Sequence, residues 1–133
     1  MKGSLKKGAG NLFLVALLVF LGIADVVGQS FFRAREWGME NNGISFGVGQ
    51  GINEGLLWLV LLFVLAVLVR NGIKDRQINV PLFLVAIGGG VNLWGRVLTG
   101  GVWDYLKLPF FDLWFNFSDV MITIGVLLAI LGK

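Results

Sequence analysis

The chain has 133 residues, of which 56% are hydrophobic and 14% charged, and its mean hydropathy is positive. This composition is typical of an integral membrane protein, and the length predicts one membrane-embedded domain over residues 1–133. The absence of cysteine and histidine excludes disulfides, thiolate zinc sites and histidine acid–base chemistry, so we expect no metal and no cofactor. The net charge is +3, and in a membrane protein the distribution of charge between the two sides says more than this sum. We therefore do not expect nucleic-acid binding.

Four apolar stretches are each close to the ~20 residues that cross a ~30 Å hydrocarbon core as a helix. They are Asn11 to Gly28, Ile52 to Val69, Val80 to Val97 and Leu113 to Leu131. The sequence therefore predicts an all-α integral membrane protein with four transmembrane helices. The first stretch resembles a cleavable signal peptide, but Asp25 interrupts it and no small-residue cleavage site follows, so we expect it to remain as a helix.

The basic residues predict the orientation, because Lys and Arg are retained on the cytoplasmic side. One side carries Lys2, Lys6, Lys7, Arg70, Lys74, Arg76 and Lys133, opposed only by Asp75. The other side collects the acidic residues Glu36, Glu40, Glu54, Asp104, Asp112 and Asp119, together with Arg33, Arg35, Arg96 and Lys107. We therefore expect both termini in the cytoplasm.

The two outer connections are rich in glycine and aromatic residues. In the first, from Gln29 to Gly51, the alternation of Ile44, Phe46 and Val48 favours a small extracytoplasmic β-like segment between the first two spans. In the second, from about Thr99 to Asp112, the aromatic residues suit the membrane interface.

A narrow polar stripe marks the third span, where Gly88, Asn92 and Arg96 follow one another at i, i+4 spacing on one helical face. The glycines favour close helix packing and Asn92 suits a hydrogen bond between helices. A positive charge inside the membrane is costly unless carboxylates pair with it, so Arg96 predicts acidic side chains beside it.

The fourth span places Asn116, Asp119 and Thr123 on one face, and Asn116 or Ser118 is suited to cap its first turn. Taken alone, Asp119 is explained by the positive end of the helix dipole. Chain connectivity, however, brings it to the outer end of the bundle together with Asp104.

Two carboxylates in a low-dielectric cleft do not both ionise easily, so one keeps a proton while the other acts as a base. That pairing activates water for peptide hydrolysis. Asp104 and Asp119 are therefore the catalytic candidates, and the helix N-terminus favours Asp119 as the base.

At these residues the chain resembles the lipoprotein signal peptidases, or signal peptidase II, which are bacterial membrane aspartyl proteases. Val102–Tyr105 (VWDY) is similar to the family's Val-Val-Asp-Phe block, and Phe115–Asp119 (FNFSD) to its Phe-Asn-x-Ala-Asp block. Asn41–Phe46 (NNGISF) is similar to Asn-x-Gly-Ala-Ala-Phe, and Asp25 falls where the family has an acidic residue in its first span.

Two positions depart from the family pattern. The third-span block Gly-Asn-x-x-Asp-Arg appears as VNLWGR over Val91–Arg96, so its acidic member is missing. The usual first-span Lys is also missing, with Gly28 and Gln29 nearby. The segment between the two aspartates is shorter than the family usually has.

The resemblance implies four spans, both termini inside, and an active site near the outer face of the bacterial cytoplasmic membrane. It implies a diacylglyceryl-prolipoprotein substrate, cut before its lipidated cysteine, with membrane lipid as the other partner; we expect a monomer. The implied catalytic residues are Asp104 and Asp119, and the supporting residues are Asp25, Asn41, Gly43, Asn92, Arg96 and Asn116. Trp103, Tyr105 and Phe46 are expected as walls of the substrate site.

Two other classes of function stay open from the residues alone. A small four-helix transporter or channel would use Asp25 to relay protons and Arg96 to bind an anion, because intramembrane charges also mark transport paths. A membrane scaffold would use the same polar groups only to hold helices together. The position of the carboxylates at one outer end favours surface chemistry, since a transporter places its essential charges near the midplane.

Overall fold

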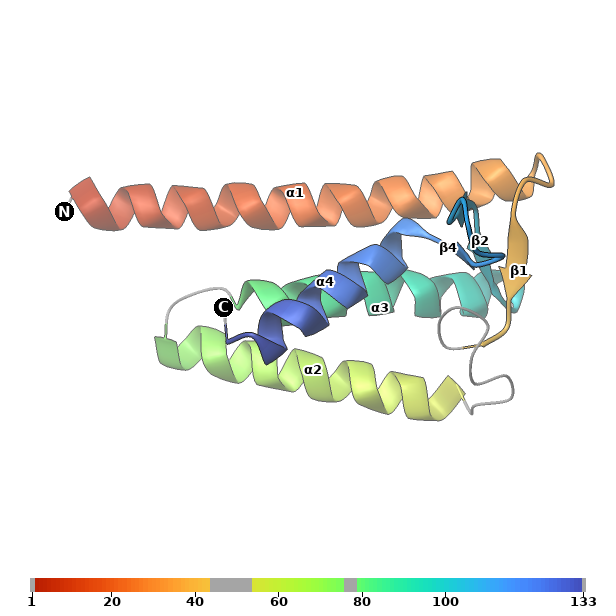
Figure 1. Cartoon of the computed structure of the whole chain (residues 1–133). Helices are drawn as coiled ribbons and strands as arrows, with labels where there is room; N and C mark the ends of the chain where they lie inside the picture. The colour runs from red at the N-terminus through yellow and green to blue at the C-terminus, as the bar shows by residue number, and fades with distance from the viewer. Residues whose placement is uncertain (1, 44–53, 76–78, 133) are drawn as a thin grey trace.

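The computed structural model describes residues 2–43, 54–75 and 79–132 (Figure 1). These residues form four helices: α1 (Lys2–Arg33), α2 (Glu54–Asp75), α3 (Val80–Thr99) and α4 (Phe117–Ile130). Short strands lie at one end of the bundle: β1 (Met39–Asn41), β2 (Val102–Asp104), β3 (Leu106–Lys107) and β4 (Trp114–Phe115). Figure 1 shows the start of α1 and the end of α4 on the side of the bundle away from the strands.

Two segments of the described helices are long and apolar enough to cross a bilayer, Leu12–Arg33 and Val80–Thr99. The apolar parts of the other two, Gly55–Asn71 and Phe117–Ile130, are shorter. The mostly helical fold and the four helices agree with the sequence, while four complete spans remain a prediction.

Helix α4 begins later than its apolar stretch, at Phe117 rather than near Leu113. The reason is that Trp114 and Phe115 are used in β4, and Asn116 then caps the helix. Its side-chain Oδ1 accepts the hydrogen bond of the Asp119 N–H at 2.9 Å, which satisfies one of the free donors of the first turn.

Helix α3 is central and contacts the other three helices, and Figure 1 shows it with α1 on one side and α2 on the other. The close approach of α4 to α3 depends on glycine. A Cβ at Gly88 would lie 2.6 Å from the Ser118 carbonyl oxygen, and a Cβ at Gly125 would lie 2.6 Å from the Pro81 carbonyl oxygen. Leu18, Leu84 and Met121 form the buried apolar core. Small residues thus permit backbone contact, as the sequence predicts.

The strands join the two outer connections to each other. β1, which follows α1, pairs antiparallel with β2, which follows α3, and Glu40 lies opposite Trp103. β3 and β4 form a hairpin between α3 and α4. A strand is therefore present between the first two helices, but its partner is distant in sequence, and the predicted alternation at Ile44, Phe46 and Val48 lies outside the described residues.

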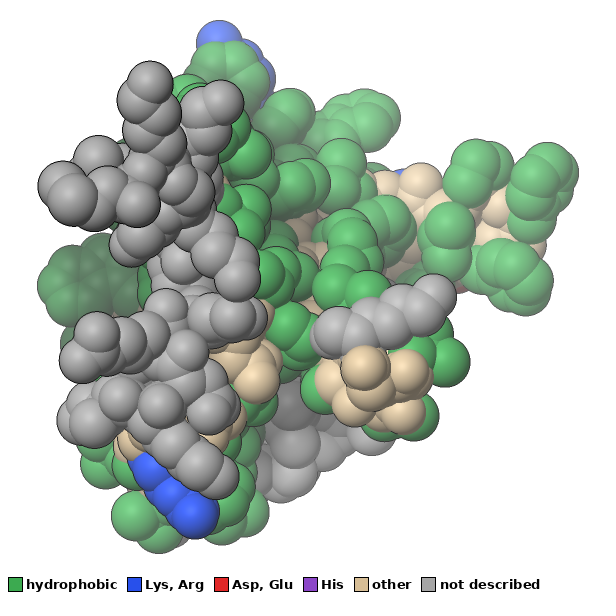
Figure 2. Space-filling model, turned by 90° about the vertical axis from the view of Figure 1, so that its left-hand side faces the viewer, with side chains coloured by type: hydrophobic (Ala, Val, Ile, Leu, Met, Phe, Trp, Pro, Cys, Tyr) green, Lys and Arg blue, Asp and Glu red, His purple; other side chains and the backbone are tan. Residues whose placement is uncertain are grey.

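Large apolar side chains cover the outside of the bundle. Examples are Phe13, Phe20 and Phe63, which are 72%, 64% and 69% exposed, and hydrophobic side chains make up most of the described surface in Figure 2. Such a surface is disfavoured in water and suits a lipid environment, which supports a membrane protein.

Candidate active site

Asp104 is the last residue of β2, and its side chain is almost completely buried, with 1% exposed. Two amides hold its carboxylate: Asn41 Nδ2 donates to Oδ2 at 2.8 Å, and Asn116 Nδ2 donates to Oδ1 at 2.8 Å. Asn41 comes from β1, so the pairing of β1 with β2 brings this donor to the carboxylate.

Asp119 lies in the first turn of α4 and is 2% exposed. Asn92 Nδ2 of α3 donates to its Oδ1 at 2.9 Å, and the backbone N–H of Asn116 donates to its Oδ2 at 3.3 Å. Together with the bond from the Asp119 N–H to Asn116, this forms a capping box. Asn116 therefore contacts both aspartates, through its side chain and through its backbone.

The electrostatic setting raises the pKa of Asp104 to about 6. Burial is the largest cause, because it penalises the charged form, and the negative charge of Asp119 adds to it. The hydrogen bonds from Asn41 and Asn116 and the charge of Arg96 act in the opposite direction and lower this pKa. The influence of Asp119 on Asp104 is the behaviour expected of two neighbouring carboxylates.

Arg96 of α3 is buried and donates a hydrogen bond to the backbone carbonyl of Gly43. The Gly43 N–H in turn donates to Asn41 Oδ1 at 2.8 Å. Arg96 therefore supports the turn that presents Asn41 to Asp104, while its charge favours the ionised form of that carboxylate. The sequence placed Arg96 near carboxylates, but it did not predict the carbonyl contact.

Asp25 of α1 is 2% exposed and lies against the start of α4. Its carboxylate accepts hydrogen bonds from the hydroxyls of Tyr105 and Ser118, each at 2.5 Å, and from the backbone N–H groups of Phe117 at 3.2 Å and Ser118 at 3.1 Å. Gln29 Nε2 also donates to it, at 3.0 Å. Asp25 thus satisfies free donors at the α4 N-terminus that the helix itself leaves unpaired.

Tyr105 takes a different place from the one the sequence suggested. Its ring stacks on Phe32 of α1, with centroids 4.8 Å apart, and its hydroxyl is directed to Asp25. Burial and the Asp25 carboxylate raise the pKa of Tyr105 above its usual value. Trp103 lies near the surface, where its Nε1 donates to the Trp37 carbonyl at 2.8 Å, and Phe46 lies outside the described residues.

The two departures from the family pattern lie against each other in space. Gln29 occupies the region of the missing first-span Lys, and Gly95 stands where the third-span acidic residue is missing. A Cβ at Gly95 would lie 3.3 Å from Gln29 Oε1, which accepts the Trp103 N–H at 3.4 Å. Gln29 therefore links Asp25 to the strand that carries Asp104. In the sequence, only the absence of the expected first-span Lys pointed to this role of Gln29.

The structure brings all eight predicted site residues to the strand end of the bundle. One acceptor among them is unsatisfied: within the described part of the chain, Asn92 Oδ1 is buried and has no hydrogen-bond partner. No group of three or more acidic side chains that could hold a metal ion occurs in residues 2–43, 54–75 and 79–132. At the centre of the site, the carboxylates of Asp104 and Asp119 accept hydrogen bonds from the side-chain amides of Asn41, Asn92 and Asn116.

The fold and the site define a class: a helical membrane protein with two neighbouring buried carboxylates at one end of its bundle. The family model described as signal peptidase (SPase) II matches residues 11–132. The chain therefore belongs to the signal peptidase II family.

Curated relatives and solved structures agree with this assignment. The chain is 35% identical over 99 residues to a lipoprotein signal peptidase of Staphylococcus aureus strain MRSA252, and 34% identical over 99 residues to that of strain JH9. Each match covers 69% of this chain and 60% of the relative's length, so the chain spans about 60% of these relatives.

Two solved structures have a similar fold. Both are described as bacterial membrane enzymes determined by the in meso method, at 2.3 Å and 1.9 Å resolution. The first has a TM-score of 0.74 and the second 0.66, each at 28% identity. The matches cover 90% of this chain and 87% and 91% of the solved chains, respectively.

Proposed function

We propose that this chain is a membrane aspartyl endopeptidase that removes the signal peptide from diacylglyceryl-modified prolipoproteins, cutting before the lipidated cysteine. The observation that carries the proposal is that Asn116 contacts both Asp104 and Asp119, which are buried together at the strand end of the bundle. Membership of the signal peptidase II family supports the choice of substrate. Both aspartates come from one chain, so a monomer suffices.

The mechanism begins with Asp104 protonated and Asp119 ionised. Burial and the neighbouring charge raise the pKa of Asp104, and the start of α4 favours a negative charge on Asp119. A water oxygen bonds to the scissile carbonyl carbon while Asp119 removes a water proton and Asp104 gives its proton to the carbonyl oxygen. A neutral tetrahedral diol results, and the two carboxyl groups have exchanged protonation states.

The second step restores the pair. Asp119 donates its proton to the leaving amide nitrogen, the carbon–nitrogen bond breaks, and Asp104 takes a proton from one diol hydroxyl as the carbonyl re-forms. The amides of Asn41, Asn92 and Asn116 fix the orientation of the two carboxylates throughout. The unsatisfied Asn92 Oδ1 is suited to accept an N–H of the substrate peptide backbone.

The same proposal includes the topology. Four spans with cytoplasmic termini would place the strand end of the bundle at the outer face of the bacterial cytoplasmic membrane. The length and apolar character of α1 and α3 support this placement, and both chain ends lie away from the strands (Figure 1). The substrate's signal helix and acyl chains already reside in the bilayer, so they reach such a site from the side.

The transporter alternative gains no support from the geometry of the described residues. Asp25 is held by hydrogen bonds from Tyr105, Gln29 and the start of α4, and Arg96 is bonded to Gly43. Both residues lie with the aspartate pair at one end of the bundle, whereas transport sites lie near the midplane.

Replacing either aspartate by asparagine tests the proposal. Asp104→Asn or Asp119→Asn should lower the cleavage rate of a purified lipoprotein precursor by about 10²–10⁴-fold, because each variant removes one partner of the proton exchange. Asp112→Asn is the matched control: Asp112 is 87% exposed and forms a salt bridge with Lys107 at the surface, so this variant should keep the wild-type rate. Cleavage at the control rate by a folded Asp104→Asn or Asp119→Asn protein would exclude the mechanism.

A further inference from the structure

Three polar side chains of α1 reach the segment of residues 101–105, which contains β2 and carries Asp104. They are Asp25, Gln29 and Arg33, and they follow one another at i, i+4 spacing. An α-helix brings residues at this spacing to one face. One face of α1 therefore lies along β2.

The partners of these three side chains are spaced two residues apart along the strand segment. The Tyr105 hydroxyl donates to Asp25 Oδ1 at 2.5 Å, the Trp103 N–H donates to Gln29 Oε1 at 3.4 Å, and Arg33 Nη2 donates to the Gly101 carbonyl at 3.0 Å. Residue numbers rise along α1 as they fall along the strand, so the two segments run antiparallel. We call these three hydrogen bonds the register contacts.

The two spacings match because the helix and the strand rise by similar amounts over them. Four residues of an α-helix rise ~6.0 Å, and two residues of a β-strand rise ~6.6 Å. The three register contacts therefore form together, and a shift of β2 by one residue would break them. Three bonds at a common repeat specify one register, whereas a single bond would leave neighbouring registers open.

The register of β2 decides where Asp104 points. Side chains alternate between the two faces of a strand, so a shift by one residue turns each of them to the opposite face. Val102 and Asp104 are both 1% exposed, whereas Trp103 between them is half-buried. In the observed register, Asp104 points to the Asn41 and Asn116 amides that hold its carboxylate.

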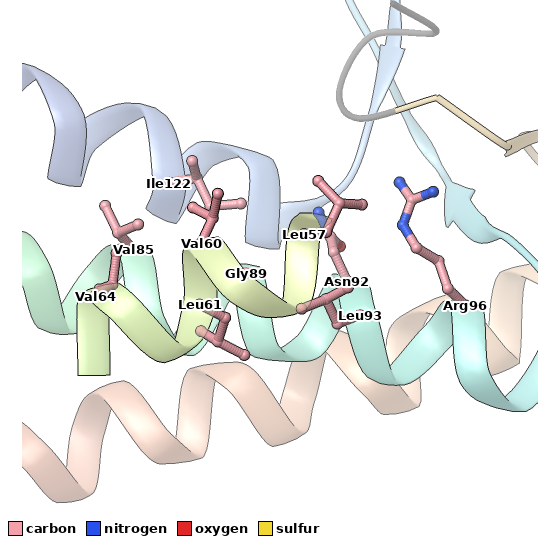
Figure 3. A pocket seen from close by; sticks show the side chains of 10 residues that line it. All are labelled: Leu57, Val60, Leu61, Val64, Val85, Gly89, Asn92, Leu93, Arg96 and Ile122. Atoms are coloured by element: carbon pink, nitrogen blue, oxygen red, sulfur yellow. The ribbon is translucent and has the colours of Figure 1, made fainter. Parts of the chain in front are cut away.

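Support from α3 comes from a different direction. Figure 3 shows the Asn92 and Arg96 side chains extending from α3 on the side away from α1. Asn92 donates to Asp119, and Arg96 donates to the Gly43 carbonyl, so these two residues hold the start of α4 and the turn after β1. The register contacts from α1 hold β2 itself.

We propose that Gln29 is a positioning residue for Asp104: as the middle register contact, it fixes β2 against α1 and holds the Asp104 carboxyl group in its reactive orientation. The inference rests on the proposed function. Gln29 acts through the backbone N–H of Trp103, the residue directly before Asp104. Its side chain is 7% exposed, so water has little access to this hydrogen bond.

A glutamine suits the middle contact because its amide donates and accepts at the same time. Nε2 donates to Asp25 at 3.0 Å while Oε1 accepts the Trp103 N–H, so the first register contact orients the second. Gly95 of α3 leaves room for this amide, since a Cβ there would lie 3.3 Å from Gln29 Oε1. Gln29 and Gly95 therefore act as a pair.

Gln29→Met tests the middle contact, because methionine has a similar length but lacks the amide. In the purified full chain we expect kcat for a lipoprotein precursor to fall by about tenfold or more with KM unchanged, since displacing a reacting group by ~1 Å lowers a rate by up to about 10²-fold. Amide hydrogen exchange measured by NMR should be about fivefold faster at the Trp103 N–H, as the loss of one ordinary hydrogen bond gives.

The pH profile distinguishes positioning from a loss of folded protein. The hydrogen bonds from Asn41 and Asn116 lower the pKa of Asp104, so a displaced Asp104 should keep its proton to higher pH. The fall of kcat/KM with rising pH should therefore move to higher pH in Gln29→Met. Asp119 and Arg96, whose charges also act on this pKa, are unchanged in the variant, and a smaller folded fraction would scale the profile without shifting it.

Ser30→Ala is the matched control. Ser30 is the next residue of α1, is exposed, and donates its hydroxyl hydrogen bond to the Val26 carbonyl of the same helix at 3.0 Å. This variant should keep the wild-type kcat, pH profile and Trp103 exchange rate.

A second variant disturbs Gln29 without removing its amide. Gly95→Ala places a methyl group 3.3 Å from Oε1, so it should lower kcat and speed Trp103 exchange, by less than Gln29→Met does. In the Gln29→Met protein the register contact is already lost, so Gly95→Ala should have a smaller effect there than in the wild type.

The outcomes separate the inference from the proposed function. An unchanged kcat or an unshifted pH profile in Gln29→Met, or effects of the two variants that simply add, overturns the inference while cleavage by the wild type still supports the peptidase. If the wild type does not cleave the precursor, the peptidase is rejected, and Trp103 exchange decides the register contact: faster exchange in Gln29→Met supports it and unchanged exchange rejects it. If Gln29→Met does not fold, Gly95→Ala takes its place in each measurement.

Discussion

Asp25 and Ser118 are joined by two hydrogen bonds, because the Asp25 carboxylate accepts both the hydroxyl and the backbone N–H of Ser118. Ser118 directly precedes Asp119, and Tyr105, which donates to the same carboxylate, directly follows Asp104. One buried carboxylate on α1 therefore holds the chain neighbours of both candidate catalytic residues. At the Tyr105 and Ser118 positions the similar family blocks have Phe and Ala, which lack these hydroxyls.

Removing the two hydroxyls should loosen the aspartate pair. We expect Tyr105→Phe combined with Ser118→Ala to lower the free energy of unfolding by about 3–6 kcal/mol, because each substitution removes one hydrogen bond to a charged group, worth about 1.5–3 kcal/mol. The value of kcat should fall several-fold with little change in KM. Thermal unfolding and steady-state kinetics of the purified protein measure both effects.

A third substitution tests whether these hydroxyls take over the role of a cation. Gln29 already donates to Asp25 at 3.0 Å, so Gln29→Lys places an ammonium group at i, i+4 from the carboxylate. Added to the Tyr105→Phe/Ser118→Ala protein, it should restore part of the lost kcat. If Gln29→Lys instead lowers kcat further, the hydroxyls do not substitute for a cation.

The pH dependence of catalysis should show an alkaline limb. Because the raised pKa of Asp104 is about 6, its proton is lost as the pH rises through that value, and kcat/KM should fall with it. The free energy of unfolding should depend on pH in the same direction. The fold favours the protonated form of Asp104, so this contribution to stability is fully present below the ordinary pKa of 3.8 and is lost as the pH rises through about 6.

Asn41→Ala should move the alkaline limb of the pH profile to higher pH. Asn41 donates to Asp104 Oδ2 at 2.8 Å and lowers the pKa of that carboxyl, so its removal should shift the alkaline limb by about one pH unit toward higher pH. The neighbouring Asn42 is exposed and serves as the control, with no shift expected in Asn42→Ala. A shift of the limb to lower pH in Asn41→Ala would contradict the assignment of Asp104 as the proton donor.

Gly38 should be intolerant of any side chain. Its φ of +117° is unfavourable for other residues, and a Cβ would lie 2.2 Å from the Asp104 carbonyl oxygen. Gly38→Ala should destabilise the protein by about 1–3 kcal/mol and lower activity, since the clash displaces the backbone of Asp104 itself. Gly100→Ala shares the positive φ, +81°, but meets nothing within 4 Å, so it should retain activity; equal losses in both variants would reject the steric explanation.

The contact between α3 and α4 should depend on Gly88. A Cβ there would lie 2.6 Å from the Ser118 carbonyl oxygen, so Gly88→Ala should push away the helix that carries Asp119 and reduce both the melting temperature and kcat. Gly90→Ala has open space around it and should be neutral or slightly stabilising, because alanine favours the helix by about 1 kcal/mol. Comparing the two melting temperatures separates helix propensity from packing.

The sequence by itself determined the helices and the polar residues of the site. Apolar runs locate the helices because the bilayer acts on each segment separately, and the stripe of Gly88, Asn92 and Arg96 follows from helical spacing alone. The buried aspartates stand out for the same reason, since an acidic group beside hydrocarbon is costly without a role.

Only the tertiary structure decided which groups meet. The pairing of β1 with β2, the bond from Arg96 to Gly43 and the contact of Asp25 with Ser118 join residues 53 to 93 positions apart. Hydropathy and spacing describe neighbours along one helix, so they carry no information about such contacts. Hydrogen bonds of buried groups are satisfied by whichever elements the packing of α3 against α1 and α4 brings together.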